Sequence, residues 1–140
     1  MTILLDSHVY LWVADERFNH KLSKELKEMI ADGDTEVYVS IVSIWELTIK
    51  LQKHWKTFEF DNALLNVDEY FPFEILTVTA DHVQQLLTLD ADPARPIHRD
   101  PFDRIMLAQA IAEGLTFVTH DSRCLQYAHP ELALLDATTV

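Results

Sequence analysis

The sequence predicts an α/β fold built around a mostly parallel sheet. Short segments rich in β-branched residues alternate along the chain with longer segments of helical character, a pattern typical of βαβ units. The segments at 2–6 and 115–119 are apolar on both faces, as strands covered by helices on both sides must be. The segment at 99–110 predicts a helix that is apolar nearly all round and therefore buried.

Local patterns define the other elements in chain order. Alternation or β-branched residues predict strands at 2–6, 36–40, 73–78 and 115–119, with a possible edge strand at 131–137. Helical spacing of apolar residues predicts helices at 7–15, 22–33, 43–55, 61–71, 79–89 and 121–129. Gly33 and Thr79 mark the end of one helix and the start of another. Residues 90–98, which contain two prolines, form a loop.

The 99–110 segment begins with signals for a helix N-terminus. Asp100 is a good N-cap, and Pro101 suits the first helical position because its missing N–H has no partner there anyway. Asp103 places a second acid in the first turn, before the apolar run. A carboxylate at the mouth of a buried helix needs a partner, since an unpaired buried charge is very costly.

Length and composition limit the class of protein. At 140 residues and 49% hydrophobic residues, the chain is expected to fold as one domain over 1–140 with a sizeable core. Cys124 is the only cysteine, which excludes an intrachain disulfide and favours a reducing, cytoplasmic setting. The N-terminus lacks the pattern of a signal peptide, and no apolar run approaches the roughly 20 residues of a membrane span.

The net charge of −12 disfavours a general nucleic-acid binder, which usually carries a basic surface. It suits a protein that binds cations or a basic partner. Any nucleic-acid function must therefore explain how an acidic chain meets a polyanion.

Four acids are predicted to meet at one edge of the sheet. Asp6 and Asp121 follow the strands at 2–6 and 115–119, and ligands of open parallel sheets bind beyond such strand ends. Asp103 begins the helix that leads into the second of these strands. Glu46 lies one turn into the helix after the 36–40 strand, so it can point to the same pocket.

Such a cluster requires protons or a cation. Two carboxylates about 5 Å apart repel by about 3 kcal/mol at an effective dielectric constant near 20. Oxygen-only ligands select hard divalent ions such as Mg²⁺ or Mn²⁺. These ions hold phosphates and lower the pKa of bound water, which suits phosphodiester hydrolysis.

Each acid also has a structural interpretation. Asp6 and Asp121 can serve only as helix N-caps, and Asp103 can serve only to stabilise the positive end of a helix dipole. Glu46 can form a surface ion pair with Lys50, four residues along. Asp100 is interpreted as a structural cap.

Basic residues form two groups beside the acids. The first continues the Glu46 helix and the second flanks Asp103, and either group can meet phosphates or simply be solvated. Their members are Lys50, Lys53, His54 and Lys56, and then Arg95, His98, Arg99 and Arg104. His8 and His120 adjoin two of the acids, where a supporting or solvent role is favoured over metal ligation.

With these residues in view, the sequence resembles the PIN-domain family and, within it, the VapC-type toxins of prokaryotic toxin–antitoxin pairs. Four pieces carry the resemblance in the family's order: ILLDSHVYLW at 3–12, SIVSIWELTIK at 40–50, HRDPFDRIMLAQA at 98–110 and LTFVTHD at 115–121. They span nearly the whole chain. Ser7 stands where the family often has threonine, a mild departure.

The resemblance implies a three-layer PIN-like α/β domain with metal-dependent endoribonuclease activity. It assigns Mg²⁺ or Mn²⁺ to Asp6, Asp103 and Asp121, with Glu46 completing the catalytic site directly or through water. Thr119 and Ser43 match polar family positions that orient the acids. It further implies a homodimer and an antitoxin that covers the site with a basic or aromatic segment, which the net charge of −12 suits.

Two other functions compete with a nuclease. A catalytically silent interaction module would keep the fold and bind a protein partner, but the presence of all four acids disfavours it. A phosphate-transfer domain would use Asp6 as nucleophile. That chemistry expects a second Asp two residues on, where this chain has His8.

Overall fold

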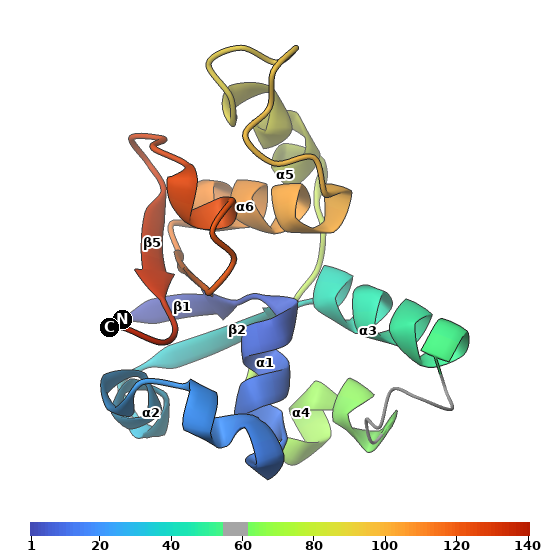
Figure 1. Ribbon diagram of the computed structural model, residues 1–140, viewed down its shortest axis with the longest axis vertical. Helices are drawn as coiled ribbons and strands as arrows, with labels where there is room; N and C mark the ends of the chain where they lie inside the picture. The colour runs from blue at the N-terminus through green and yellow to red at the C-terminus, as the bar shows by residue number, and fades with distance from the viewer. Residues whose placement is uncertain (55–61) are drawn as a thin grey trace.

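The structure, a computed structural model, describes residues 1–54 and 62–140. Its centre is a five-stranded sheet in the order β3-β2-β1-β4-β5, in which every neighbouring pair is parallel (Figure 1). The strands are β1 (Thr2–Leu5), β2 (Glu36–Ser40), β3 (Glu74–Leu76), β4 (Thr116–Thr119) and β5 (Ala133–Asp136). The predicted parallel sheet is confirmed, including β5 as an edge strand.

Helices cover both faces of this sheet and give three layers. Ile3 and Leu5 of β1 belong to one apolar cluster and Leu4 to another, because alternate side chains of a strand point to opposite faces. The first face packs against α1 (Ser7–Ala14), α2 (Lys24–Ala31) and α4 (Val67–Tyr70). The second packs against α6 (Pro101–Glu113), with α5 (Ala80–Gln85) beyond it (Figure 1). The α3 helix (Ile41–His54) follows β2 directly and extends away from the sheet.

The α6 helix forms as its sequence predicts. The Asp100 carboxylate accepts from the backbone N–H groups of Phe102 and Asp103, and Pro101 occupies the first turn. Gly114 ends the helix with φ of 66°, a left-handed conformation that favours glycine. Gln109 is buried among the apolar residues of α6, and its amide bonds the Ser40 hydroxyl and the Thr77 carbonyl.

Several predicted helices are shorter than expected. The one at 61–71 becomes a 3-10 turn, η2 (Asn62–Leu65), followed by one-turn α4, with residue 61 outside the described residues. The one at 79–89 splits into α5 and η3 (Leu86–Thr88). The one at 121–129 is reduced to η4 (Cys124–Gln126). The other predicted helices lie within two residues of α1, α2 and α3 where the chain is described, and a 3-10 helix, η1 (Glu16–Lys21), follows α1.

Burial fixes both ends of the η4 turn. Cys124 and Tyr127 are both buried in the cluster on the α6 side of the sheet. Tyr127 is the C-cap of η4 and has an extended backbone, so the helix ends before it. Among the helices within residues 1–54 and 62–140, none is sufficiently long and apolar to span a bilayer.

Candidate active site

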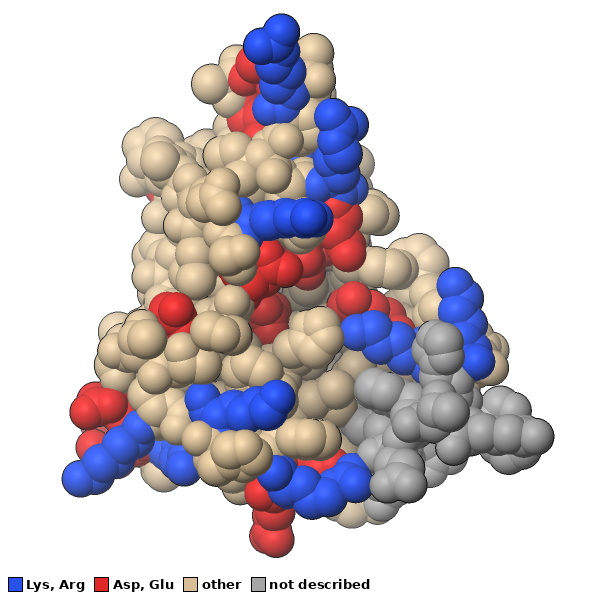
Figure 2. Space-filling view, in the orientation of Figure 1, with Lys and Arg blue, Asp and Glu red and all other residues tan. Residues whose placement is uncertain are grey.

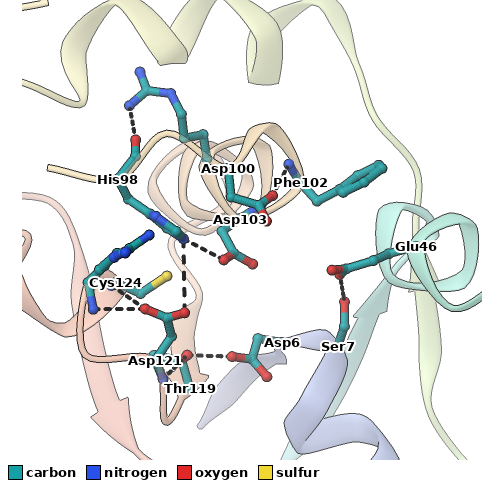
Figure 3. Close-up of polar contacts among 12 residues, drawn as sticks. Asp6, Ser7, Glu46, His98, Asp100, Phe102, Asp103, Thr119, Asp121 and Cys124 are labelled. Atoms are coloured by element: carbon teal, nitrogen blue, oxygen red, sulfur yellow. Dashed lines mark hydrogen bonds and ion pairs between the residues drawn. The ribbon is translucent and has the colours of Figure 1, made fainter. Parts of the chain in front are cut away.

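A cavity of about 360 Å³ lies at the carboxyl edge of the sheet and contains all four predicted acids. Asp6 follows β1, Glu46 lies in α3, Asp103 lies in the first turn of α6 and Asp121 follows β4. Their carboxyl groups point into one shared space (Figure 3). The cavity lining is completed by His8, Trp12, His98, Asp100, His120 and Arg123.

Asp6 is both a helix cap and a member of the cavity. One carboxylate oxygen accepts from the Val9 backbone N–H at 2.8 Å, and the other accepts from the Thr119 hydroxyl. Burial raises the pKa of Asp6 to about 6, although both hydrogen bonds oppose the shift. The negative charges of Glu46 and Asp121 raise it further. Asp6 therefore holds its charge at a cost in the metal-free protein.

Asp103 is paired with a histidine from the basic group that the sequence places beside it. His98 is 5% exposed, and its Nε2 lies 2.7 Å from an Asp103 carboxylate oxygen. Burial raises the pKa of Asp103 to about 6, with the His98 hydrogen bond opposing the shift. The charges of Asp100, Asp6 and Glu46 also raise it.

Asp121 is connected to both of these aspartates. Its backbone N–H donates to the Thr119 hydroxyl oxygen at 3.0 Å, so one side chain links Asp6 and Asp121. One carboxylate oxygen caps the following turn, and the other lies 4.0 Å from His98 Nε2. His98 therefore stands between Asp103 and Asp121 (Figure 3).

Glu46 is held by the start of α1. The Ser7 hydroxyl donates to a Glu46 carboxylate oxygen at 2.6 Å. Lys50 Nζ lies 3.9 Å from the other oxygen, so Glu46 forms the ion pair that the sequence allowed while still facing the cavity. Ser43 Oγ lies 2.9 Å from Ser7 Oγ and 3.3 Å from Met106 Sδ, so it reaches the acids only through Ser7.

The donor set fits a hard cation, but its carboxylates are spread apart. Ligand oxygens of one Mg²⁺ ion lie at about 2.1 Å from it and so within about 4.2 Å of one another. In the described part of the chain, two sets of three potential ligand atoms lie within 4.8 Å: His98, Asp121 and Cys124, and His98, Asp100 and Asp103. The three predicted aspartates form no such set. Each of the three is held by its own hydrogen bonds, so side-chain rotation would be needed to bring them onto one cation.

The basic residues are arranged differently from the sequence expectation. Arg104 is not available to a ligand, because it bonds Asp90 at 2.8 Å, the His98 carbonyl and the Tyr127 hydroxyl. It thereby fixes the backbone of His98. Arg123, which the sequence did not indicate, lines the cavity instead. Lys56 lies outside the described residues.

These observations define a class: a parallel α/β domain with four carboxylates gathered at the carboxyl edge of its sheet. The sequence matches the PIN domain family over residues 3–130. The chain belongs to the PIN-domain family, whose members are in general nucleases. No curated protein sequence gives a significant match.

Solved structures with the same fold come from bacterial VapBC complexes. A chain of VapBC2 from Rickettsia felis, bound to a promoter DNA fragment, is 18% identical with a TM-score of 0.72, covering 97% of this chain and 98% of that one. A chain of VapBC-5 from Mycobacterium tuberculosis is 19% identical, with a TM-score of 0.67 and coverage of 96% and 98%. A chain of DNA-bound VapBC from Salmonella typhimurium is 19% identical, with a TM-score of 0.63 and coverage of 97% and 98%.

Proposed function

We propose that this protein is a Mg²⁺- or Mn²⁺-dependent endoribonuclease that acts as the toxin of a toxin–antitoxin pair. The observation that carries the proposal is the meeting of four carboxylates, from four separate segments of the chain, in one cavity. Membership of the PIN family supports a nuclease. The similarity of fold to chains of VapBC complexes supports the toxin role.

In this proposal Asp6, Asp103 and Asp121 hold the cation, and Glu46 completes the site directly or through water. The bound ion lowers the pKa of a water molecule and offsets negative charge on the phosphate. The Thr119 hydroxyl orients two of the aspartates. Neighbouring side chains thus keep the carboxylates facing the cavity while they are still unliganded.

A partner antitoxin and a homodimer complete the proposal. The solved VapBC structures are complexes, and an acid-lined cavity suits a basic segment of an inhibitor. Two exposed apolar residues of α5 and η3 supply surface for a second copy: Val83 and Leu87. The buried, unpaired Cys124 supports a reducing, cytoplasmic setting.

The test is cleavage of a pool of single-stranded RNA in the presence of Mn²⁺. We expect Asp6→Asn, Asp103→Asn and Asp121→Asn each to lower the rate at least about 100-fold, because each removes one charge from the cation site. Glu46→Gln is expected to be milder if its contact runs through water. A loss as large as that of Asp6→Asn would show direct ligation instead.

Asp100 offers a matched control within the same cavity. Asparagine caps helices as well as aspartate does, so Asp100→Asn should keep activity within about threefold. A loss equal to that of Asp103→Asn would place Asp100 among the ligands. Undiminished cleavage by all three aspartate variants would refute the site. A wild-type protein that cleaves no RNA with either metal, yet binds a partner, would be a silent interaction module.

A further inference from the structure

Positive side chains border the acidic cavity although the protein as a whole is strongly acidic. The cavity-bearing face shows lysine and arginine side chains around a hollow in which acidic side chains are visible (Figure 2). Three cations are tied to the cavity by specific contacts. Arg123 lines it, Lys50 lies 3.9 Å from Glu46, and Lys21 lies over the ring of Trp12, which is itself a lining residue.

One side of the cavity mouth combines these cations with aromatic rings. Trp12 of α1 is partly exposed, and its ring centroid lies 5.9 Å from that of His120, with the two planes tilted by 53°. Lys21 Nζ, at the end of η1, lies 5.2 Å from the Trp12 ring centroid. Arg123 lies three residues after His120 along the chain. We call Trp12, Lys21, His120 and Arg123 the Trp12 strip.

The end of β5 holds the His120 ring in place. Its Nδ1 lies 3.1 Å from an Asp136 carboxylate oxygen and 3.3 Å from the Thr138 hydroxyl. The His120 side chain nevertheless keeps 53% of its surface exposed. The ring is thus both oriented by its neighbours and accessible at the mouth of the cavity.

We propose that the Trp12 strip is a subsite for single-stranded RNA, in which a base packs against the Trp12 and His120 rings while flanking phosphates meet Lys21 and Arg123. Proteins that bind single strands combine aromatic stacking surfaces with cations that follow the backbone. The inference rests on the proposed nuclease function, because the strip leads to the carboxylates where the cut would occur.

The charge of the strip favours nucleic acid over a basic peptide. Phosphates entering the cavity meet five carboxylates, and cations at its mouth offset that repulsion. A basic inhibitor segment would be attracted by the cavity but repelled by Lys21 and Arg123. A double strand would keep its bases stacked on one another and leave the Trp12 ring without a partner.

The experiment measures binding separately from cleavage. A fluorescein-labelled single-stranded RNA of about twelve nucleotides is titrated with the Asp6→Asn protein, and anisotropy reports the affinity. Adding Trp12→Ala should weaken binding about tenfold or more, within the range that base stacking on an aromatic ring provides. Trp12→Phe should keep most of the affinity. Lys21→Met should lower the slope of log Kd against log salt by about 0.7.

Matched controls come from the same residue types outside the cavity lining. Trp45 is 60% exposed in α3 without lining the cavity, so Trp45→Ala should leave the RNA affinity within about twofold. Lys24 of α2 pairs with Glu28, and Lys24→Met should leave the salt slope unchanged. A duplex of the same sequence should bind several-fold more weakly than the single strand.

Cleavage kinetics separate the failure of this inference from the failure of the proposed function. In the otherwise wild-type protein, Trp12→Ala should raise KM about tenfold and change kcat little. Suppose that the wild type is active and that the Trp12→Ala and Lys21→Met variants have the same KM and RNA affinity as the wild type. That result overturns the subsite but not the nuclease function. An inactive wild type that still shows Trp12-dependent RNA binding overturns the nuclease and supports the subsite. If Trp12→Ala and Lys21→Met weaken binding of a labelled arginine-rich peptide but not of RNA, the strip binds a protein partner and the inference is overturned.

Discussion

The two ends of α6 carry the same pair of residue types in different surroundings. At the N-terminal end Asp103 pairs with His98 at 2.7 Å, and at the C-terminal end Glu113 pairs with His82 at 2.8 Å. Both histidines are buried. The helix dipole favours an anion at the first end and disfavours one at the second. Distance and burial of the imidazole alone therefore do not distinguish a structural pair from a pair in the candidate active site.

The difference lies in how the remaining polar atoms are satisfied. His82 Nδ1 accepts from the Thr79 backbone N–H, so Nε2 carries the proton and donates to Glu113, whose side chain is 45% exposed to water. His98 Nδ1 has no hydrogen-bond partner among the residues that the structure describes. Its partner Asp103 shares the cavity with four further carboxylates. A pair whose atoms are all satisfied stabilises the fold, whereas the pair in the cavity remains able to respond to a ligand.

The largest expected contrast is in catalysis. Replacing each acid by its amide removes one negative charge at either end of α6. Asp103→Asn should lower Mn²⁺-stimulated RNA cleavage at least about 100-fold, whereas Glu113→Gln should leave it within about twofold, because only Asp103 faces the cavity. Initial rates under saturating Mn²⁺ measure both. Equal losses in the two variants would mean that the comparison reflects α6 stability and not the site.

The second contrast compares the stability and the metal response of two histidine variants. His82→Ala removes a helix cap and a buried hydrogen-bonded ring, so it should lower the free energy of unfolding by about 2–4 kcal/mol. Its activity per folded molecule should be unchanged. His98→Ala should instead raise the Mn²⁺ concentration for half-maximal cleavage about tenfold, as loss of a residue that orients a ligand does.

Urea denaturation and metal titration of the same two preparations check this contrast. Only His98→Ala is expected to change the metal response. Both substitutions remove a buried hydrogen-bonded ring, so both can lower stability, but His82→Ala should leave the metal response unchanged. A His98→Ala protein with a normal metal response and a large loss of stability would make both pairs structural.

The smallest effect concerns pH in the metal-free protein. The pKa of Asp6 is about 6 when folded against an ordinary value of 3.8, so the folded state binds this proton more tightly than the unfolded chain does. Its contribution to the free energy of unfolding is full below pH 3.8 and is lost as pH rises through 6, by about 1 kcal/mol between pH 5 and 7. Asp103 acts in the same direction.

The measurement is urea unfolding in EDTA at pH 5 and 7 for the wild type and Asp6→Asn. The variant is needed because burial lowers the pKa of His8, which raises stability over the same pH range. The difference between the two proteins isolates Asp6, and Asp6→Asn should be the more stable at pH 7. A wild-type protein that is more stable than Asp6→Asn at pH 7 would contradict the burial cost.

The fold was largely predictable because its main signals are local. The apolar strand at 2–6, the Asp100–Pro101 start of α6 and the glycine at its end each depend on neighbouring residues. Short elements were less predictable. The Cys124 turn and the α4 region have few residues and depend on which side chains reach the core, so helical spacing overestimated both.

The candidate site was predictable only as a set of acids. Positions at strand ends and in first helical turns indicated which carboxylates lie at the carboxyl edge of the sheet, because all parallel strands end at that edge. Nothing in the local sequence indicated that Arg104 turns away to Asp90. The family resemblance indicated that Thr119 orients the acids, but not that it joins Asp6 to Asp121. These contacts link residues from separate elements, and their distances depend on how the layers pack.

By itself, the sequence determined a parallel α/β fold with acids at the carboxyl ends of its strands, since those features follow from the alternation of apolar segments and from local capping. Only the tertiary structure decided how those acids are partnered and how far apart they stand. The physical reason is that hydrogen bonds and Coulomb forces act over a few ångströms, and packing alone brings distant parts of the chain within that range.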